Sequence, residues 1–193
     1  MKYDITLIGN YTKDTVTTTQ ETKYVDGGGF NYGAHAARAL GAKVAAVTRL
    51  NINDKHVVNN LEAIGIDVFP TYTPESTHME LIYPTNNFDN RTLIMPKSAG
   101  SFTSKQFESI NSKIFLVNAS VRDEFKLETL FDLKKKEALI GIDLQGFIRT
   151  KDDKNILKDT IWEQKEEALA MTHYLKADAV EAEFLTGESD LVA

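Results

Sequence analysis

The feature that most constrains this 193-residue chain is a regular alternation of short apolar runs and helical patterns. Helical spacing recurs at residues 31–40, 54–64, 123–136 and 156–171. The apolar runs predict buried strands at residues 4–8, 44–47, 114–117, 139–144 and 174–175. Strands and helices in this order predict an α/β fold, in which a mostly parallel sheet is flanked by helices.

Capping residues and glycines mark the ends of the predicted helices. Asn31 and Asp54 stand where N-caps are expected, and Gly41 and Gly65 stand where the helices should end. Two stretches break the alternation, at about residues 11–26 and 69–95, and both are rich in Thr and Tyr. They predict antiparallel excursions that form a small extra sheet within a single domain covering residues 1–193.

Composition excludes several classes of function. The chain has 22 basic and 28 acidic residues, a net charge of −6, which argues against a nucleic-acid platform or a basic membrane helix. The absence of cysteine excludes disulfides, thiolate catalysis and cysteine-based zinc sites. No apolar run approaches the roughly 18 residues of a membrane span, and the amino terminus does not resemble a signal peptide. We therefore expect a soluble, cytoplasmic protein.

Three glycines open one helical pattern, in the segment Asp26-Gly27-Gly28-Gly29-Phe30-Asn31. Glycines let the backbone come close to a bound group, and Asn31 can cap the helix or donate to a ligand hydroxyl. The segment lacks the Gly-Lys-Ser/Thr of a Walker loop and does not fit G-x-G-x-x-G. A turn that enters a closely packed helix explains the same residues, so both interpretations stay open.

Polar residues also follow predicted strands at their carboxyl ends, where parallel α/β sheets bind ligands. Asp14 lies shortly after the first strand and is suited to accept hydrogen bonds from sugar or polyol hydroxyls, although an ordinary surface turn is the alternative. Asp143, Gln145 and Arg149 form a dense polar cluster after the 139–144 run. This cluster favours a binding site over a structural ion pair between Asp143 and Arg149.

Two carboxylates, Asp178 and Glu181, lie three residues apart at the start of a further helix and so share one face of it. Such a pair can hold a hydrated Mg²⁺ ion, which keeps most of its water ligands. By spacing alone, however, complementing the helix dipole is the favoured interpretation. The four histidines show no metal-ligand spacing.

Taken together, these segments resemble the ribokinase-like (PfkB) family of carbohydrate kinases. The resemblance covers residues 4–187 and rests on three matches: Gly9-x4-Asp14, the glycine turn ending at Asn31 before Ala36-Ala37-Arg38-Ala39-Leu40-Gly41, and Glu181-Ala182-Glu183-Phe184-Leu185-Thr186-Gly187. The three glycines and the 143–149 segment look most similar to a mainly archaeal branch that includes inositol and nucleoside kinases.

This resemblance implies a Rossmann-like body with a small β-sheet lid, and phosphoryl transfer from ATP, with Mg²⁺, to a hydroxyl of a sugar, polyol or nucleoside. It also implies a homodimer formed through the lid. The residues predicted to bind the small-molecule substrate are Asp14, Gly27, Gly28, Asn31, Asp143, Gln145 and Arg149. Lys176 is predicted to contact the ATP cofactor, and Asp178 and Glu181 to act on Mg²⁺ through water.

The sequence also departs from the family pattern. Asp178 stands where the family has Asn, and Asp26 stands where it usually has Gly. The Gly-Ala-Gly-Asp segment, which carries the family's catalytic base and anion hole, does not occur in these 193 residues, so we assign no catalytic residue. We therefore expect a carboxy-terminally incomplete domain with one open sheet edge, which is a poor catalyst by itself.

Two other functions stay open. The chain can be a non-catalytic ligand-binding or regulatory module of the same fold. It can also be an unrelated nucleotide-binding α/β domain, with residues 27–31 as a phosphate-binding turn at a helix start. The kinase and the module both predict polyol binding that depends on Asp14, whereas the third function predicts nucleotide binding that is indifferent to Asp14.

Overall fold

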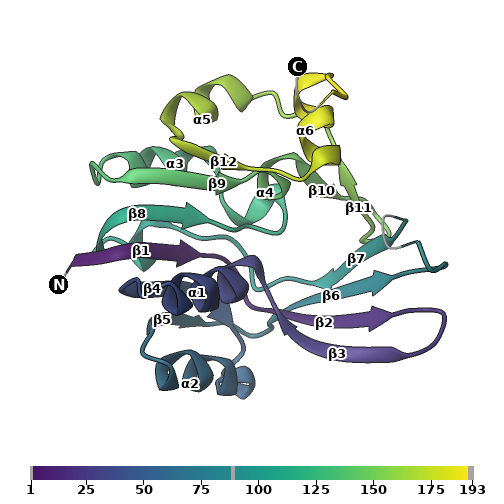
Figure 1. Cartoon of the computed structure of the whole chain (residues 1–193), viewed down its shortest axis with the longest axis horizontal. Coiled ribbons are helices and arrows are strands. Elements are labelled where there is room, and N and C mark those ends of the chain that lie inside the picture. Colours follow the sequence, from purple (N-terminus) through teal and green to yellow (C-terminus); the bar gives the residue numbers. More distant parts are fainter. Residues whose placement is uncertain (1, 88–89, 191–193) are drawn as a thin grey trace.

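The apolar runs form a six-stranded sheet in a computed structural model that describes residues 2–87 and 90–190 (Figure 1). The sheet order is β12-β9-β8-β1-β4-β5, and every neighbouring pair is parallel. Its strands are β1 (Lys2–Ile8), β4 (Val44–Leu50), β5 (Asp67–Tyr72), β8 (Asn111–Val117), β9 (Leu139–Asp143) and β12 (Tyr174–Lys176). The predicted α/β fold class is confirmed.

Helices cover both faces of this sheet. The α-helices are α1 (Gly29–Ala39), α2 (His56–Ala63), α3 (Leu127–Lys134), α4 (Gln145–Ile148), α5 (Lys165–Met171) and α6 (Ala179–Thr186). Short 3-10 turns are η1 (Ile52–Asp54), η2 (Ser104–Gln106) and η3 (Arg122–Glu124). In β1, Leu7 packs with α1 and α2 while Ile8 packs with α3 and α5, because successive strand residues point to opposite faces. None of the described helices is both long and apolar enough to span a membrane.

A second sheet projects beyond the carboxyl ends of the central strands (Figure 1). Its order is β3-β2-β6-β7, where β2 and β6 are parallel and the other pairs are antiparallel. Its strands are β2 (Thr12–Thr17), β3 (Thr22–Gly27), β6 (Thr77–Ile82) and β7 (Thr92–Lys97). The predicted small sheet is present, but its second segment does not begin at residue 69, because β5 belongs to the central sheet.

The prediction of a helix over 156–171 is wrong in its first half. β10 (Arg149–Lys151) and β11 (Leu157–Asp159) form an antiparallel hairpin, and α5 begins only at Lys165. The hairpin also reaches β7, where the Met95 N–H donates to the Asn155 carbonyl at 2.8 Å. Backbone partners on two sides therefore override the helical spacing of the apolar residues.

Three local predictions also need correction. Asn31 does not cap α1, because Gly28 occupies the cap position. Asp54 does not cap α2 either. Asp54 lies in η1, and its buried carboxylate accepts hydrogen bonds from Lys13 and Ser76. The helix predicted over 123–136 is shorter, since η3 precedes α3.

Candidate functional site

The candidate site is a cavity of about 460 Å³ between the carboxyl ends of the central strands and the four-stranded sheet. We call it the central cavity. Six of the residues predicted from sequence line it: Asp14, Gly28, Asp143, Gln145, Arg149 and Lys176. The four-stranded sheet adds an apolar wall of Met79, Leu81 and Leu93. The remaining lining residues are Thr12, Gly29, Tyr32, Arg91, Asn118 and Ser120.

A second cavity of about 490 Å³ adjoins the first and shares Arg91, Leu93 and Arg149 with it. Asp178 and Glu181, the residues predicted to act on Mg²⁺, line this second cavity together with Asp159 of β11. The predicted substrate and metal residues therefore lie in two connected cavities at one end of the sheet.

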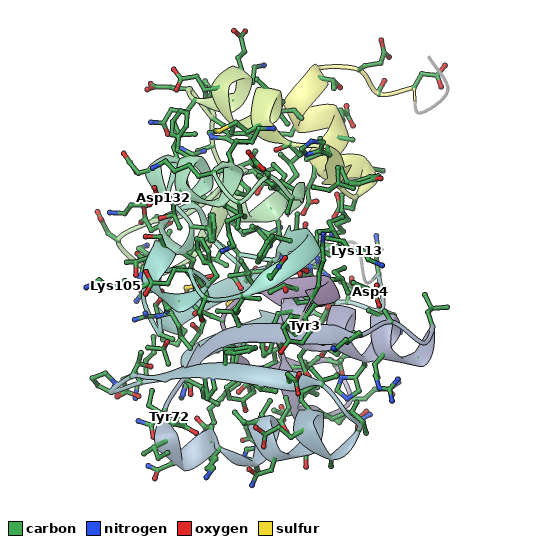
Figure 2. The ribbon with its side chains drawn as sticks, turned by 90° about the vertical axis from the view of Figure 1, so that its left-hand side faces the viewer. Tyr3, Asp4, Tyr72, Lys105, Lys113 and Asp132 are labelled. Atoms are coloured by element: carbon green, nitrogen blue, oxygen red, sulfur yellow. The ribbon has the colours of Figure 1, made fainter. Side chains whose placement is uncertain are left out.

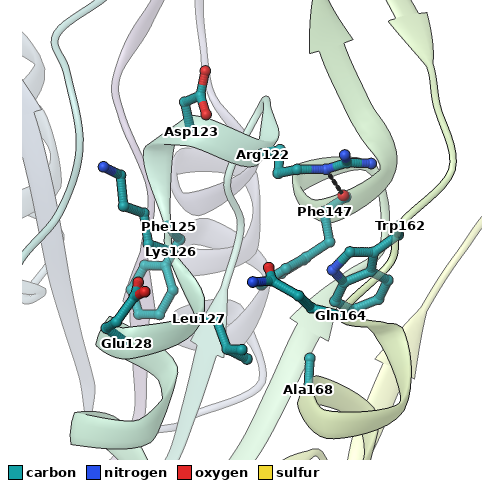
Figure 3. A pocket seen from close by; sticks show the side chains of 10 residues that line it. All are labelled: Arg122, Asp123, Phe125, Lys126, Leu127, Glu128, Phe147, Trp162, Gln164 and Ala168. Carbon is teal, nitrogen blue, oxygen red and sulfur yellow. Dashed lines mark hydrogen bonds between the residues drawn. The ribbon is translucent and has the colours of Figure 1, made fainter.

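A smaller hollow of about 210 Å³ lies between α3, α4 and α5 (Figure 3). Aromatic side chains from Phe125, Phe147 and Trp162 line it. The guanidinium group of Arg122 at this hollow is already engaged, since its Nε donates to the Phe147 carbonyl at 2.6 Å. No residue predicted from sequence lines this hollow, so we place the candidate site in the central cavity.

Asp14 lies on β2 and packs directly against Gly27 of β3. A Cβ atom at Gly27 would lie 2.0 Å from Asp14 Oδ2, so the carboxylate can occupy this place only beside a glycine. Burial raises the pKa of Asp14 to about 6, the Thr12 hydroxyl opposes the shift, and the charge of Asp26 adds to it. Asp14 Oδ1 is buried and has no hydrogen-bond partner within the described ranges 2–87 and 90–190. This oxygen is suited to receive a ligand hydroxyl.

Only some residues of the glycine turn line the central cavity. Gly28 has a φ of +100°, and a side chain there would lie 2.7 Å from the Asn10 carbonyl oxygen. The Asn31 side chain is buried and donates to the Asp26 carbonyl oxygen at 3.2 Å. Neither Gly27 nor Asn31 lines the central cavity. Gly27 makes room for Asp14, and Asn31 braces the turn.

Charged side chains line another part of the central cavity: Asp143 and Arg149 are buried, and Lys176 is exposed. Lys176 Nζ donates to Asp143 Oδ1 at 3.2 Å, and burial raises the pKa of Asp143 although the Lys176 charge opposes this. Arg149 donates to Gln145 Oε1 at 3.1 Å and to Glu181 Oε1 at 3.3 Å. Arg149 thus forms ion pairs with Glu181 and Asp159, and Lys176 with Asp143 and Glu181; an Asp143–Arg149 ion pair is not found among the described residues.

Asp178 and Glu181 form a capping box at the start of α6. Asp178 Oδ1 accepts the Glu181 N–H at 2.8 Å, and Glu181 Oε2 accepts the Asp178 N–H at 3.0 Å. Within the part of the chain that the structure describes, no three His, Cys, Asp or Glu side chains group as metal ligands. This donor set does not fit a direct metal centre, and contact of Asp178 and Glu181 with Mg²⁺ through water stays a prediction.

Several lining residues were not predicted from sequence. Asn118 and Ser120 follow β8 at its carboxyl end, so the strand-end rule that identified Asp143 also applies to them. Tyr32 lies one turn inside α1, and Arg91 directly precedes β7. Their presence in the cavity depends on how the four-stranded sheet folds over the central one, which no local pattern encodes.

Comparison with known proteins agrees with this geometry. Residues 1–192 match the family described as pfkB family carbohydrate kinase. The curated proteins contain no match to the sequence. A solved structure of a pyrophosphate-dependent kinase in the ribokinase family, in complex with sulfate, is 29% identical, with a TM-score of 0.90 over 97% of this chain. The chain spans 66% of the length of that kinase.

Two further solved structures are similar to this chain, one at the same sequence identity and one at a lower identity. A pyrophosphate-dependent myo-inositol-1 kinase, converted into a myo-inositol-3 kinase, is 29% identical, with a TM-score of 0.88 over 97% of this chain and 64% of that one. Ribokinase from Arabidopsis thaliana, complexed with ribose and ATP, is 17% identical, with a TM-score of 0.68 and the same coverage, which shows the fold alone. The predicted resemblance and the ribokinase-like fold are confirmed, and the chain belongs to the pfkB family of carbohydrate kinases.

Proposed function

We propose that the protein phosphorylates a hydroxyl group of a small cyclic polyol held in the central cavity. The observation that carries this proposal is Asp14 Oδ1, a buried carboxylate oxygen without a partner in the described part of the chain, in a cavity of a carbohydrate-kinase family member. A buried acceptor without a donor is costly unless a ligand supplies one. A polyol offers hydroxyl donors of that kind.

The two walls of the cavity suit the two kinds of surface that a ring polyol presents. Asp14, Asn118 and Gln145 offer oxygen and amide groups to hydroxyls. Met79, Leu81 and Leu93 offer apolar surface to the C–H groups of a ring. Kinases of myo-inositol are among the solved structures 29% identical to this chain, which supports an inositol-like acceptor.

For the phosphoryl donor we propose inorganic pyrophosphate, since both kinases at 29% identity described above are pyrophosphate-dependent. The acceptor oxygen attacks the terminal phosphorus, a C–O–P link forms, and the P–O–P bond breaks to release phosphate. The hydroxyl proton leaves to a base that we assign to no residue of this chain. Arg149, Lys176 and Arg91 supply the positive charge near the transferred group. ATP, expected from the family resemblance, is the competing donor.

Binding without turnover is the second candidate. Asp14 and the cavity would then select a ligand whose phosphorylation takes place elsewhere.

Calorimetry followed by turnover assays separates these functions. Myo-inositol, ribose and adenosine are titrated into the wild-type chain, Asp14→Asn and the remote control Asp132→Asn. We expect myo-inositol to bind the wild type and the control, and at least tenfold more weakly to Asp14→Asn. Phosphate release from pyrophosphate, or ADP release from ATP, with Mg²⁺ and the bound polyol, then identifies the donor. Binding without release supports the second candidate. Equal binding of every ligand by Asp14→Asn contradicts the site.

A further inference from the structure

Trp162 is a buried side chain with a free hydrogen-bond donor at the hollow between α3, α4 and α5 (Figure 3). It is 5% exposed, and its ring lies against that of Phe147 with 5.1 Å between the ring centroids and 35° between the planes. In Figure 3 the nitrogen edge of the indole is turned toward Phe147 and Gln164. Within residues 2–87 and 90–190, no group accepts a hydrogen bond from this N–H. A buried tryptophan N–H usually has an acceptor, so a ligand can supply the one that is missing here.

A second polar group without a partner lies at the same hollow. The side-chain amide of Gln164, the residue before α5, forms no hydrogen bond in the described part of the chain, and in Figure 3 it points into the hollow. Arg122 is not available in the same way, because its Nε and Nη2 atoms donate to backbone carbonyl groups. The remaining charged lining residues are exposed and so belong to the rim: Asp123, Lys126 and Glu128. The indole N–H and the Gln164 amide are therefore the polar groups best placed to bind a ligand.

The most deeply buried residues of the hollow are apolar or aromatic. Phe125 and Phe147 line it together with Trp162, and all three are buried. Ala168 of α5 is fully buried and contributes only a methyl group, which leaves space between the aromatic side chains. That space is about 210 Å³, more than the roughly 150 Å³ of an apolar cavity that holds benzene. One substituted six-membered ring therefore fits.

The aromatic walls favour an aromatic ligand over water or a polyol. Water can accept the Trp162 N–H, but it leaves the faces of the neighbouring rings without dispersion contacts. A polyol brings several hydroxyls, and each of them loses hydrogen bonds to water in a hollow that offers few partners. A flat aromatic ring gains contacts with Phe125, Phe147 and Trp162 and needs few polar partners. An acceptor on that ring completes the hydrogen bond of the indole.

We propose that this hollow binds a small aromatic molecule that carries a carbonyl group, such as an aromatic carboxamide. Its ring packs against the aromatic side chains, and its carbonyl oxygen accepts the hydrogen bond of the Trp162 N–H. The Gln164 amide pairs with the rest of the carboxamide group. This site goes beyond the proposed function and does not rest on it, since none of the described residues lines both the hollow and the central cavity.

Tryptophan fluorescence reports on this site directly, because Trp162 is the one tryptophan of the chain. Benzamide is titrated into the wild-type chain, and free N-acetyl-tryptophanamide corrects for collisional quenching. We expect a saturable change in emission with a Kd of about 1 mM or lower. Cyclohexanecarboxamide keeps the carboxamide and lacks the aromatic ring, so it should bind about fivefold more weakly. Absence of saturation with benzamide, or equal binding of the two amides, overturns the proposal.

Two variants test the polar groups by calorimetry with benzamide. Trp162→Phe keeps an aromatic ring and removes the N–H, and Gln164→Ala removes the amide. Each should weaken binding about fivefold, the loss expected from one hydrogen bond. Tyr72→Phe is the matched control, because it removes the polar end of an aromatic side chain on β5, at the other edge of the central sheet from β12 (Figure 2). It should bind benzamide as the wild type does.

Wild-type affinity for benzamide in Trp162→Phe overturns the proposal. If Trp162→Phe does not fold, Gln164→Ala changes an exposed residue and decides in its place, with unchanged binding again the overturning result. Asp14→Asn should bind benzamide as the wild type does, and excess myo-inositol should not displace benzamide from the wild type. Displacement assigns benzamide to the central cavity and overturns the proposal. Failure of myo-inositol to bind, with benzamide binding as expected, contradicts the proposed function alone.

Discussion

Gly27 is the residue on which the place of Asp14 depends most directly. Gly27→Ala puts a Cβ atom 2.0 Å from Asp14 Oδ2, and the carboxylate is the movable partner because it ends a side chain. We expect Gly27→Ala to fold and to lose myo-inositol affinity at least tenfold in calorimetry, as Asp14→Asn does. The double variant should be no weaker than either single variant, since both remove one interaction. Additive losses contradict this account.

Glu124 is a buried carboxyl group, and the N–H of Ser120, a residue that lines the central cavity, donates to its Oε2 at 2.7 Å. Burial raises its pKa to about 7 against donors from Ser120 and Asn10. The folded state therefore holds this proton more tightly than the unfolded state. Its contribution to stability is complete below about pH 4.5 and is lost as the pH rises to about 7.

The expected loss from this group is on the order of 3 kcal/mol of unfolding free energy between pH 4.5 and 8. Urea denaturation of the wild type and Glu124→Gln at several pH values measures it. Glu124→Gln should lack this part of the decline, because glutamine is neutral throughout. If the unfolding free energies of the two proteins decline in parallel between pH 4.5 and 8, the role given to Glu124 is contradicted.

At the scale of elements, Arg122 of η3 ties α4 to the loop after β11. Its Nε donates to the Phe147 carbonyl, and its second guanidinium nitrogen donates to the carbonyls of Ile148 and Thr160 at 3.3 and 2.8 Å. Lysine cannot reproduce this planar fork. Arg122→Lys should lower the unfolding free energy by about 1–3 kcal/mol in urea denaturation. Arg38→Lys on α1, where Arg38 Nε donates to the Ile64 carbonyl near the surface, is the control and should change it far less.

The elements also mark the limit of sequence-based prediction. The strand runs around residues 4–8 and 114–117 are predictable because their apolar residues are buried or partly buried on both faces of the sheet. Leu157 carries the same apolar signal, but it packs with Met79, Met95 and Val121 beneath the four-stranded sheet. Its strand partner, Lys151, is local, but the residues against which its side chain packs are remote in sequence. Arg91 likewise lines the central cavity because of packing between segments remote in sequence. Asp178 and Glu181 form a capping box, and the same three-residue spacing would place two metal-binding carboxylates on one helix face.

At the scale of the whole molecule, strand β3 is suited to form the homodimer that the family resemblance predicts. β3 lies at the edge of the four-stranded sheet, and Tyr24 and Val25 on it are 84% and 39% exposed. An exposed edge strand with apolar side chains is prone to pair with another chain. Sedimentation velocity should show a dimer for the wild type and a monomer for the double variant Tyr24→Lys/Val25→Lys. A wild-type monomer at high concentration refutes this prediction.

The β10–β11 hairpin connects the body of the protein to the four-stranded sheet. It leaves the body at Arg149, whose guanidinium contacts Glu181 on α6, and its turn meets β7 through Asn155 and Ile156. The hairpin therefore joins the four-stranded sheet to Arg149, which lines both the central cavity and the second cavity.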